Sequence, residues 1–267
     1  MQKWSKYKII FSDFDGTIIG SDYQPSNALK ESVTRWQKSG RIFSIVTGKP
    51  YFGPVKDICQ FLGIKAPVVV NGGALIIDSQ TDKIIDGAYI NRDEAEKVLS
   101  DLRSKKLLFE VRTDKKSYAS HKRLRELKKH RQFDSIENLT VGNIVFFRIH
   151  THAIGDSTND YIRKEFEQKF PDLHIIQANA PYAKGIEITS KFTSKHTAVL
   201  KIIKMLNIDV SETIGVGDEL NDYPLLTACN YKVVMQNGNE KLKEIADEII
   251  PSYDKSGVAV FIDNILS

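Results

Sequence analysis

Cysteine is scarce in this chain, which has only Cys59 and Cys229 among its 267 residues. The two lie far apart in the sequence, and neither belongs to a pair with the spacing of metal ligands. A disulfide framework is therefore not expected, and the small number of cysteines fits a protein of a reducing compartment. We expect a cytoplasmic protein.

Long apolar runs are also missing, so no segment predicts a membrane-spanning helix. Residues 1–8 alternate charged and aromatic side chains and lack the apolar core of a signal peptide. A formal net charge of +4 is small for this length and does not point to a nucleic-acid partner. With 41% apolar and 27% charged residues, the composition is that of an ordinary globular protein.

The two ends of the chain share one pattern, in which short β-branched segments alternate with helical ones. In the first third the segments are residues 8–12, 26–39, 42–47, 51–61 and 68–71. In the last third they are residues 194–206, 213–217, 220–228 and 231–235. Such alternation is typical of a parallel sheet with helices packed on it.

The middle of the chain has a different pattern, because strand candidates at residues 107–111 and 143–149 are separated by polar helices. It is read as α+β. We therefore predict an α/β fold with a doubly wound, Rossmann-like parallel sheet core, formed by residues 1–78 plus 185–267. An α+β domain of residues 79–184 is inserted into it, and the ligand is expected at the carboxyl ends of the parallel strands.

The sharpest motif is the run Asp13-Phe14-Asp15-Gly16-Thr17, which follows an apolar strand candidate directly. A carboxylate at the end of such a strand projects into the ligand crevice, and Gly16 permits the turn that brings a second carboxylate beside it. Asp13 could then attack phosphorus, while Asp15 protonates the leaving oxygen and later takes a proton from water. The alternative is an Asp-rich turn without a function.

This run resembles the first motif of the haloacid dehalogenase superfamily, whose fold is the doubly wound sheet predicted above. Thr47 and Gly48 end another strand candidate and resemble the second motif, where a hydroxyl and a backbone N–H bind the phosphoryl group. Lys195, near a helix start, resembles the third motif, where an ammonium offsets developing negative charge. Taken alone, these residues would be an ordinary turn and a solvated lysine.

The run from Gly217 to Asp222 matches the fourth motif of that superfamily, Gly-Asp-x-x-Asn-Asp. Its chemistry is that of a Mg²⁺ site, since Mg²⁺ prefers oxygen ligands and is held by few carboxylates. The resemblance implies that Asp13 and Asp218 ligate the metal directly and Asp15 does so through its backbone carbonyl. It also implies that Asp222 acts through water or as an acceptor behind the ligands, and that Asn221 helps to hold the phosphate.

The inserted segment resembles the large α+β cap of the Cof-like branch. The run Val70-Asn71-Gly72-Gly73 resembles the Asn-Gly signature that this branch carries before its cap. Two positions depart from that branch. His196 stands where the branch commonly has glycine, and Lys49 where it has arginine. Lys49 keeps the positive charge but loses the planar, two-pronged donor. We nevertheless place Lys49 with Gly48 and Asn221 among the residues expected to bind the substrate phosphate.

We expect a Mg²⁺-dependent phosphatase that hydrolyses small phosphorylated metabolites, with sugar phosphates foremost, through an aspartyl phosphate. The basic stretch at residues 115–131 is either a solvated face or an attraction for substrates with extra anionic groups. Two alternatives stay open, a sugar-phosphate phosphomutase and a non-catalytic protein that binds phosphorylated metabolites. We expect a monomer or weak homodimer with no nucleic-acid or membrane partner.

Overall fold

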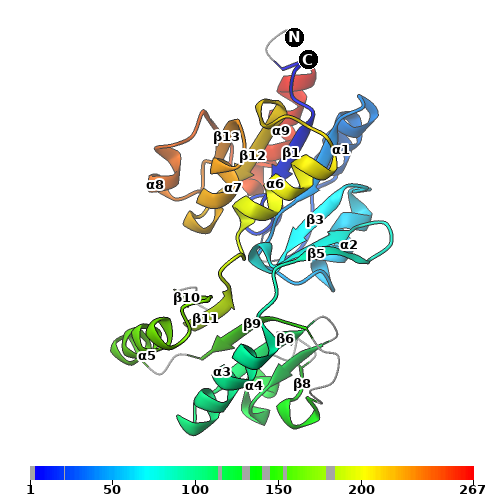
Figure 1. Cartoon of the computed structure of the whole chain (residues 1–267). Helices are drawn as coiled ribbons and strands as arrows, with labels where there is room; N and C mark the ends of the chain where they lie inside the picture. Colours follow the sequence, from blue (N-terminus) through cyan, green and yellow to red (C-terminus); the bar gives the residue numbers. More distant parts are fainter. Residues whose placement is uncertain are drawn as a thin grey trace. The chain divides into compact units, whose positions relative to one another are not determined.

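The computed structural model describes residues 4–20, 22–113, 116–127, 133–139, 145–152, 155–178 and 184–267. The chain forms two compact units (Figure 1). Each has its own hydrophobic core. One comprises Met1–Gly87 and Ser194–Ser267, and the other comprises Ala88–Thr193. The second unit is thus an insertion into the sequence of the first.

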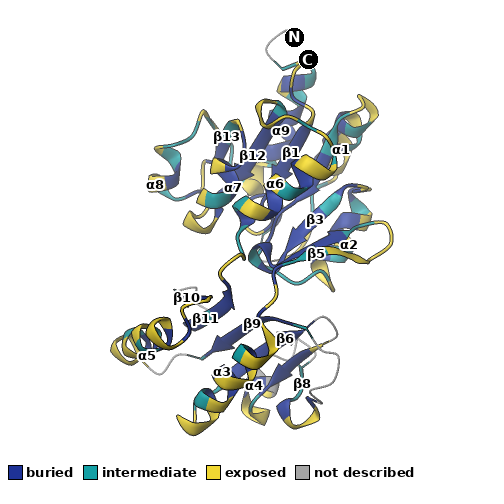
Figure 2. Cartoon of the chain, in the orientation of Figure 1, coloured by how far each residue is buried: buried dark blue, intermediate teal, exposed yellow. Residues whose placement is uncertain are grey.

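A five-stranded parallel sheet forms the centre of the first unit. Its order is β14-β13-β12-β1-β2, with β1 at Ile9–Ser12, β2 at Ile42–Ile45, β12 at Thr213–Gly217, β13 at Tyr231–Met235 and β14 at Glu248–Ile250. Strands β1 and β12 are buried along their whole length (Figure 2), which explains their continuous rather than alternating apolar sequences. Because β1 and β12 pair with each other, the N-terminal and C-terminal parts of the chain meet in the interior of this sheet.

Helices complete the first unit by burying apolar faces against the sheet. They are α1 (Asn27–Lys38), α2 (Pro54–Phe61), α6 (Lys195–Met205), α7 (Tyr223–Thr227), α8 (Glu240–Lys243) and α9 (Gly257–Leu266). Helix α1 begins after Ser26, whose hydroxyl accepts a hydrogen bond from the Leu29 N–H at 3.1 Å. Helix α6 buries Val199 and Ile202 in one cluster with Phe11 of β1. Fully burying side chains of this size contributes roughly 1.5–3 kcal/mol each.

A short antiparallel sheet extends the first unit beyond β2. It has the order β3-β4-β5, at Pro67–Val70, Leu75–Asp78 and Ile84–Gly87. A parallel bridge between Val46 and Val69 joins it to the end of β2. The β4-β5 hairpin therefore belongs to the first unit, although the sequence placed its second strand in the insertion.

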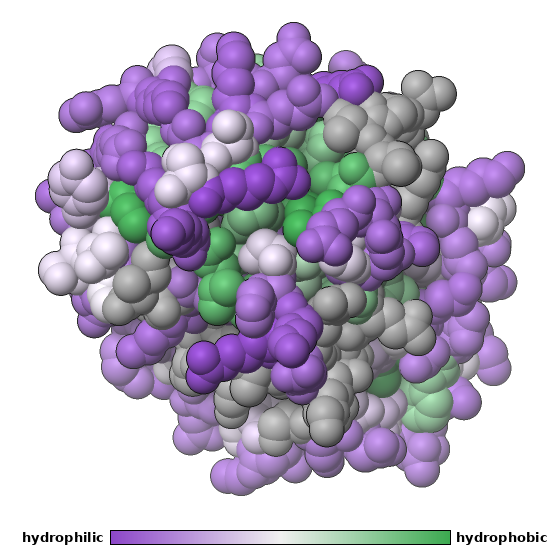
Figure 3. Space-filling model, turned by 90° about the horizontal axis from the view of Figure 1, so that it is seen from below, coloured by the Kyte–Doolittle hydropathy of each residue, from purple (hydrophilic) through white to green (hydrophobic). Residues whose placement is uncertain are grey.

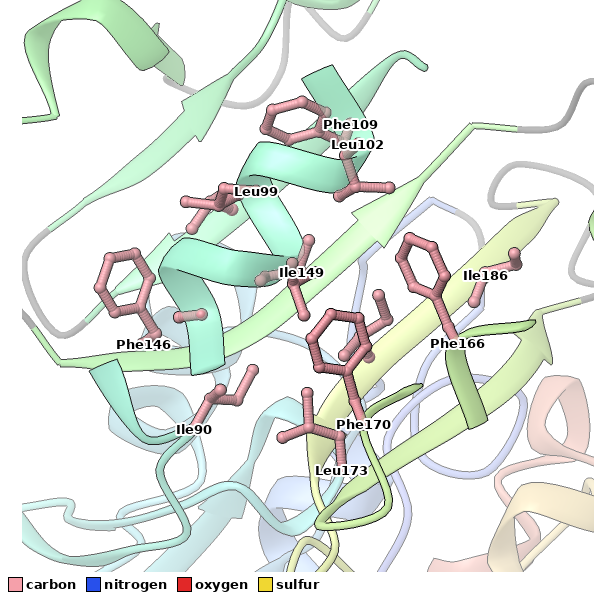
Figure 4. Packing of buried hydrophobic residues seen from close by; sticks show 14 of the residues in the cluster. Ile90, Leu99, Leu102, Phe109, Phe146, Ile149, Phe166, Phe170, Leu173 and Ile186 are labelled. Atoms are coloured by element: carbon pink, nitrogen blue, oxygen red, sulfur yellow. The ribbon is translucent and has the colours of Figure 1, made fainter. Parts of the chain in front are cut away.

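The second unit is a six-stranded sheet of order β10-β11-β9-β6-β7-β8, antiparallel except between β7 and β8. Its strands are β6 (Phe109–Thr113), β7 (Ser117–Ala119), β8 (Phe133–Ser135), β9 (Phe146–Thr151), β10 (Leu173–Ala178) and β11 (Gly185–Ser190). Its helices are α3 (Arg92–Ser104), α4 (Lys122–Leu127) and α5 (Asp156–Lys169). Leu102 of α3 and Phe166 of α5 share a core with Ile149 of β9 (Figure 4).

The predicted fold class, a parallel-sheet α/β core with an inserted α+β domain, is confirmed. The sequence-based domain limits fall somewhat earlier in the chain than the limits of the two units. The reason is strand pairing, because β5 pairs with β4 in the first unit and β11 pairs with β10 in the second. Within the basic stretch, residues 115 and 128–131 lie outside the described residues, as do 143 and 144 of the strand expected at 143–149.

The surface is mostly hydrophilic when seen from below, with small apolar areas between charged and polar residues (Figure 3). Among the described residues, the helices are all too short or too polar to cross a membrane.

Candidate active site

Asp13 lies directly after β1, at the carboxyl end of the parallel sheet, and its side chain is buried. Its backbone N–H donates to the Val216 carbonyl oxygen at 2.8 Å, which continues the pairing of β1 with β12. Asp218 follows β12 and therefore emerges at the same edge of the sheet. Parallel pairing thus brings together two acids that are far apart in the sequence.

Gly16 turns the chain tightly against Asp218. Its φ is +74°, and a Cβ atom at this position would lie 2.1 Å from Asp218 Oδ2. Thr17 Oγ1 donates a hydrogen bond to Asp218 Oδ1 at 3.0 Å. The turn of the first motif therefore fixes the carboxylate of the fourth, and no residue larger than glycine fits between them.

Lys195 is the first residue of α6, and its side chain is 4% exposed. Its Nζ donates to Asp13 Oδ1 at 2.5 Å and also to Asp222 Oδ1. Helix α6 starts at Ser194, whose hydroxyl accepts from the His196 N–H at 3.1 Å. The ammonium group thus links the first and fourth motifs inside a buried site.

Asp222 is fully buried, and both of its carboxylate oxygens are engaged. Oδ1 accepts from Lys195, while Oδ2 accepts from the backbone N–H groups of Asp218 and Glu219, at 3.0 and 3.1 Å. Asn221 precedes it in the same turn and is exposed. Asp222 therefore organises the turn that carries Asp218.

The electrostatics of the site favour an additional cation. Burial raises the pKa of Asp13 well above its usual range, and the Asp222 carboxylate raises it further. Burial and Asp222 also raise the pKa of Asp218, to about 7. Burial alone would lower the pKa of Lys195, but the two carboxylates beside it raise it above its ordinary value. One ammonium faces three buried carboxyl groups, so a bound cation would relieve their repulsion.

The donor set fits the expected Mg²⁺. Asp13, Asp218 and Asp222 each offer a carboxylate oxygen, and the three oxygens lie within 4.8 Å of one another. Mg²⁺ is usually held by one or two carboxylates together with water and substrate oxygens. Asp13 and Asp218 suit direct ligation, whereas the hydrogen bonds already made by Asp222 suit the outer role expected for it.

Thr47 follows β2 at the same edge of the sheet and is buried. Its N–H donates to the Val69 carbonyl oxygen at 2.9 Å, and its Oγ1 accepts from the Lys49 N–H at 3.1 Å. Gly48 lies between these two residues. The Thr47 hydroxyl is thus held at the end of a strand next to β1, with its proton still available to donate.

The Asp15 side chain is 49% exposed, far more than that of Asp13, and it forms an ion pair with Lys49. Lys49 Nζ lies 3.3 Å from Asp15 Oδ1. Burial raises the pKa of Asp15, and Lys49 opposes that rise. The structure therefore places Lys49 against the expected acid and base, a contact that the sequence did not predict.

Asn237, which follows β13, also contacts the site and was not predicted. Its Nδ2 donates to the Gly16 carbonyl oxygen at 2.9 Å, and its Oδ1 accepts from the Tyr253 N–H at 3.2 Å. The Asn239 N–H donates to the Asp218 carbonyl oxygen at 2.7 Å. An Asn-Gly-Asn turn is common in proteins, so only its place after a strand of the same sheet could have indicated this role.

Gly73 supports the start of α6. Its φ is +102°, and a Cβ atom there would lie 2.2 Å from the Ser194 carbonyl carbon and 2.6 Å from the Lys195 nitrogen. Gly72 also has a positive φ, +71°, but a Cβ atom there would meet nothing within 4 Å. The two glycines share a positive φ, which would strain any other residue, and they differ in the space around them.

We expect Gly73→Ala to lower the free energy of unfolding by about 1–3 kcal/mol more than Gly72→Ala, because only the former forces backbone atoms apart. It should also slow catalysis, since displacing α6 moves Lys195 away from Asp13. Urea unfolding of both variants measures the first effect. Equal destabilisation by the two substitutions would show that Gly73 is needed only for its backbone angle.

Comparison with known proteins adds independent information. The family model described as haloacid dehalogenase-like hydrolase matches residues 10–262. The phosphatase YwpJ of Bacillus subtilis strain 168 is 27% identical, over 97% of this chain and 100% of its own length. From the same strain, 5-amino-6-(5-phospho-D-ribitylamino)uracil phosphatase YwtE is 25% identical, over 97% of this chain and 98% of its own.

A solved haloacid dehalogenase-like hydrolase from B. subtilis superposes with a TM-score of 0.81 at 27% identity, over 96% of this chain and 99% of that one. The matches extend over almost the whole chain, including both units. They confirm the sequence-based expectation of a phosphatase-type enzyme of the haloacid dehalogenase superfamily with a Cof-like insertion. The chain belongs to the haloacid dehalogenase-like hydrolases.

Proposed function

We propose that this hydrolase is a Mg²⁺-dependent phosphatase that acts on small phosphorylated metabolites, foremost sugar phosphates, through a phosphoryl group carried by Asp13. The observation that best supports this is the buried bridge of Lys195 between Asp13 and Asp222, with Asp218 beside it. The substrate class is supported by the similarity to YwtE, a phosphatase whose substrate carries a phosphorylated ribityl chain.

Asp13 would act as the nucleophile, with one oxygen held by Lys195. Its bond to phosphorus forms as the bond from phosphorus to the leaving oxygen breaks, and Asp15 gives its proton to that oxygen. Asp15 then takes a proton from water while the water oxygen bonds to phosphorus and the bond to Asp13 breaks. The products are an alcohol and inorganic phosphate.

The other site residues would hold the phosphoryl group and the cation. The Thr47 hydroxyl can donate to a phosphoryl oxygen, and Gly48 and Asn221 are the further phosphate-binding residues of the proposal. Mg²⁺, when bound by Asp13, Asp218 and the Asp15 carbonyl, would offset the charge on the carboxylates and on the phosphoryl group. Asp222 would keep Asp218 in place through its backbone contacts.

The two units would divide these tasks. The nucleophile, the acid, the metal ligands and Lys195 all lie in the unit of Met1–Gly87 and Ser194–Ser267, which we propose as the catalytic core. We propose Ala88–Thr193 as the cap domain that selects the substrate. Cys59 and Cys229 are buried free thiols, which supports the proposed cytoplasmic location. A monomer or weak homodimer is part of the same proposal.

Phosphate release from a panel of sugar phosphates, nucleotides and an aryl phosphate tests this function, with Mg²⁺ present and with it removed by a chelator. We expect release with Mg²⁺ and its loss on chelation, reversed by adding the metal back. Release without a bisphosphate activator would exclude the phosphomutase. Binding of a substrate without release in any condition would favour the non-catalytic alternative.

A further inference from the structure

The Lys49 ammonium group is held between two partners in the first unit. Its Nζ lies 3.3 Å from Asp15 Oδ1 and donates to the Tyr23 hydroxyl at 2.8 Å. The same nitrogen lies 5.0 Å from the centroid of the Tyr23 ring, within the range of a cation–π contact. At the other end of the residue, the Lys49 N–H donates to Thr47 Oγ1. Both ends of Lys49 are therefore fixed.

Tyr23 is itself held in an unusual backbone conformation. Its φ is +55°, a region that large side chains rarely adopt. Such a conformation persists only where the surroundings maintain it, and it occurs often at functional sites. Tyr23 lies in the segment that runs from the first motif to α1, and that segment places its hydroxyl against Lys49.

We propose that Lys49, secured by Tyr23, is a positioning residue that orients the Asp15 carboxyl for proton transfer to the leaving group. The contact engages Asp15 Oδ1, which leaves Oδ2 to carry the proton. Asp15 needs such support because its side chain is half exposed, whereas Asp13 is fixed by burial and by Lys195. The inference rests on the proposed phosphatase function, and it gives Lys49 a role through Asp15 in place of direct phosphate binding.

The two roles differ in how the effect of Lys49 depends on the leaving group. An aryl phosphate such as 4-nitrophenyl phosphate releases a stable phenolate, which departs without protonation. A sugar phosphate releases an alkoxide, which needs the proton from Asp15. General acid catalysis typically contributes about 10²–10⁴-fold, so a disoriented Asp15 should cost far more with the sugar phosphate. A lost phosphate contact would cost the same with both substrates.

The experiment measures kcat and KM with 4-nitrophenyl phosphate and with the best sugar phosphate of the panel. We expect Lys49→Met to lower kcat at least about tenfold more with the sugar phosphate than with the aryl phosphate. Tyr23→Phe, which removes only the hydroxyl, should shift that ratio in the same direction by less. Lys49→Arg should restore most of the ratio, because it keeps the charge. Lys56 lies on α2 and is paired with Asp82, so Lys56→Met removes a lysine away from Asp15 and should leave the ratio unchanged.

The ratio of the two kcat values does not respond to partial unfolding, because unfolded molecules are lost equally from both assays. Equal losses with both substrates in Lys49→Met, together with a raised KM, would overturn the positioning role while the phosphatase function stands. A native chain that releases no phosphate from either substrate would overturn the proposed function and this inference together.

Discussion

Replacing Lys195 by methionine is expected to lower the free energy of unfolding by about 3–5 kcal/mol, because it leaves buried carboxylates without their cation. Asp13 and Asp222 are both buried, and the carboxylate of each accepts a hydrogen bond from Lys195 Nζ. Methionine keeps the length of the apolar stem, so the fall in the free energy of unfolding measures mainly the effect of removing the charge. Phosphate release should fall to background, since Asp13 loses the group that fixes it.

The destabilisation should depend on pH in a defined direction. The pKa of Asp13 is raised in the folded chain, so its protonated form favours folding, and the variant recovers stability as the pH falls towards the ordinary value of 3.8. The pKa of Lys195 is also raised, so its contribution in the native chain is complete below 10.5 and is lost only as the pH rises through the raised value. The difference between the two proteins is therefore expected to be larger at neutral than at acidic pH.

Lys201→Met is the matched control for this prediction. Lys201 lies on the same helix, α6, and pairs with Asp86 at 2.8 Å, but its side chain is 41% exposed. Exposed pairs of this kind contribute roughly 0–1 kcal/mol. Urea unfolding of both variants at neutral and acidic pH measures the contrast. If Lys195→Met cost no more than Lys201→Met, the buried bridge would not be stabilising this site.

Replacing Asp13 by asparagine is expected to lower phosphate release on the order of 10⁴–10⁶-fold, the scale of losing a nucleophile or its base in a hydrolase. An amide oxygen has nearly the same position but cannot form the phosphoryl bond that the carboxylate forms. The fold should be little affected, because removing a charge whose burial raises its pKa offsets the lost contact with Lys195. Steady-state release by the two proteins measures the effect.

Asp57→Asn is the control for that substitution, since Asp57 is an exposed aspartate on α2. It should retain native turnover. Activity in Asp13→Asn within tenfold of the native chain would exclude Asp13 as the nucleophile, whatever the metal dependence.

The parallel core and its acids could be predicted because they depend on local patterns. Short apolar runs that end in Asp13, Thr47 or Asp218 indicate buried strands, and parallel strands place their carboxyl ends at one edge. The position of Lys195 followed from a resemblance, and the structure now gives the physical reason, a helix that starts beside Gly73. The existence of these strands is thus encoded in short local patterns, whereas their order in the sheet was not predicted.

Contacts made by loops were not predictable in the same way. Nothing in the sequence near Lys49 indicates Asp15 or Tyr23 as its partners, since the three residues meet through turns whose paths depend on the whole core. The contact of Asn237 with Gly16 has the same origin. Residues 185–190 were assigned to the core from the sequence, because their alternation of apolar and polar residues does not say which sheet they join. The pairing of β11 with β10 and β9 places them in the second unit.

The measurement that tests the central claim most directly is detection of the phosphoryl group on Asp13. The native chain is mixed with Mg²⁺ and its best substrate, quenched in acid within one turnover, digested and analysed by mass spectrometry. We predict a peptide containing Asp13 that carries the mass of one phosphoryl group, is labile to hydroxylamine and is absent from Asp13→Asn. Rapid phosphate release with no phosphorylated Asp13 peptide at any quench time, or with the label on another residue, would contradict the proposed mechanism.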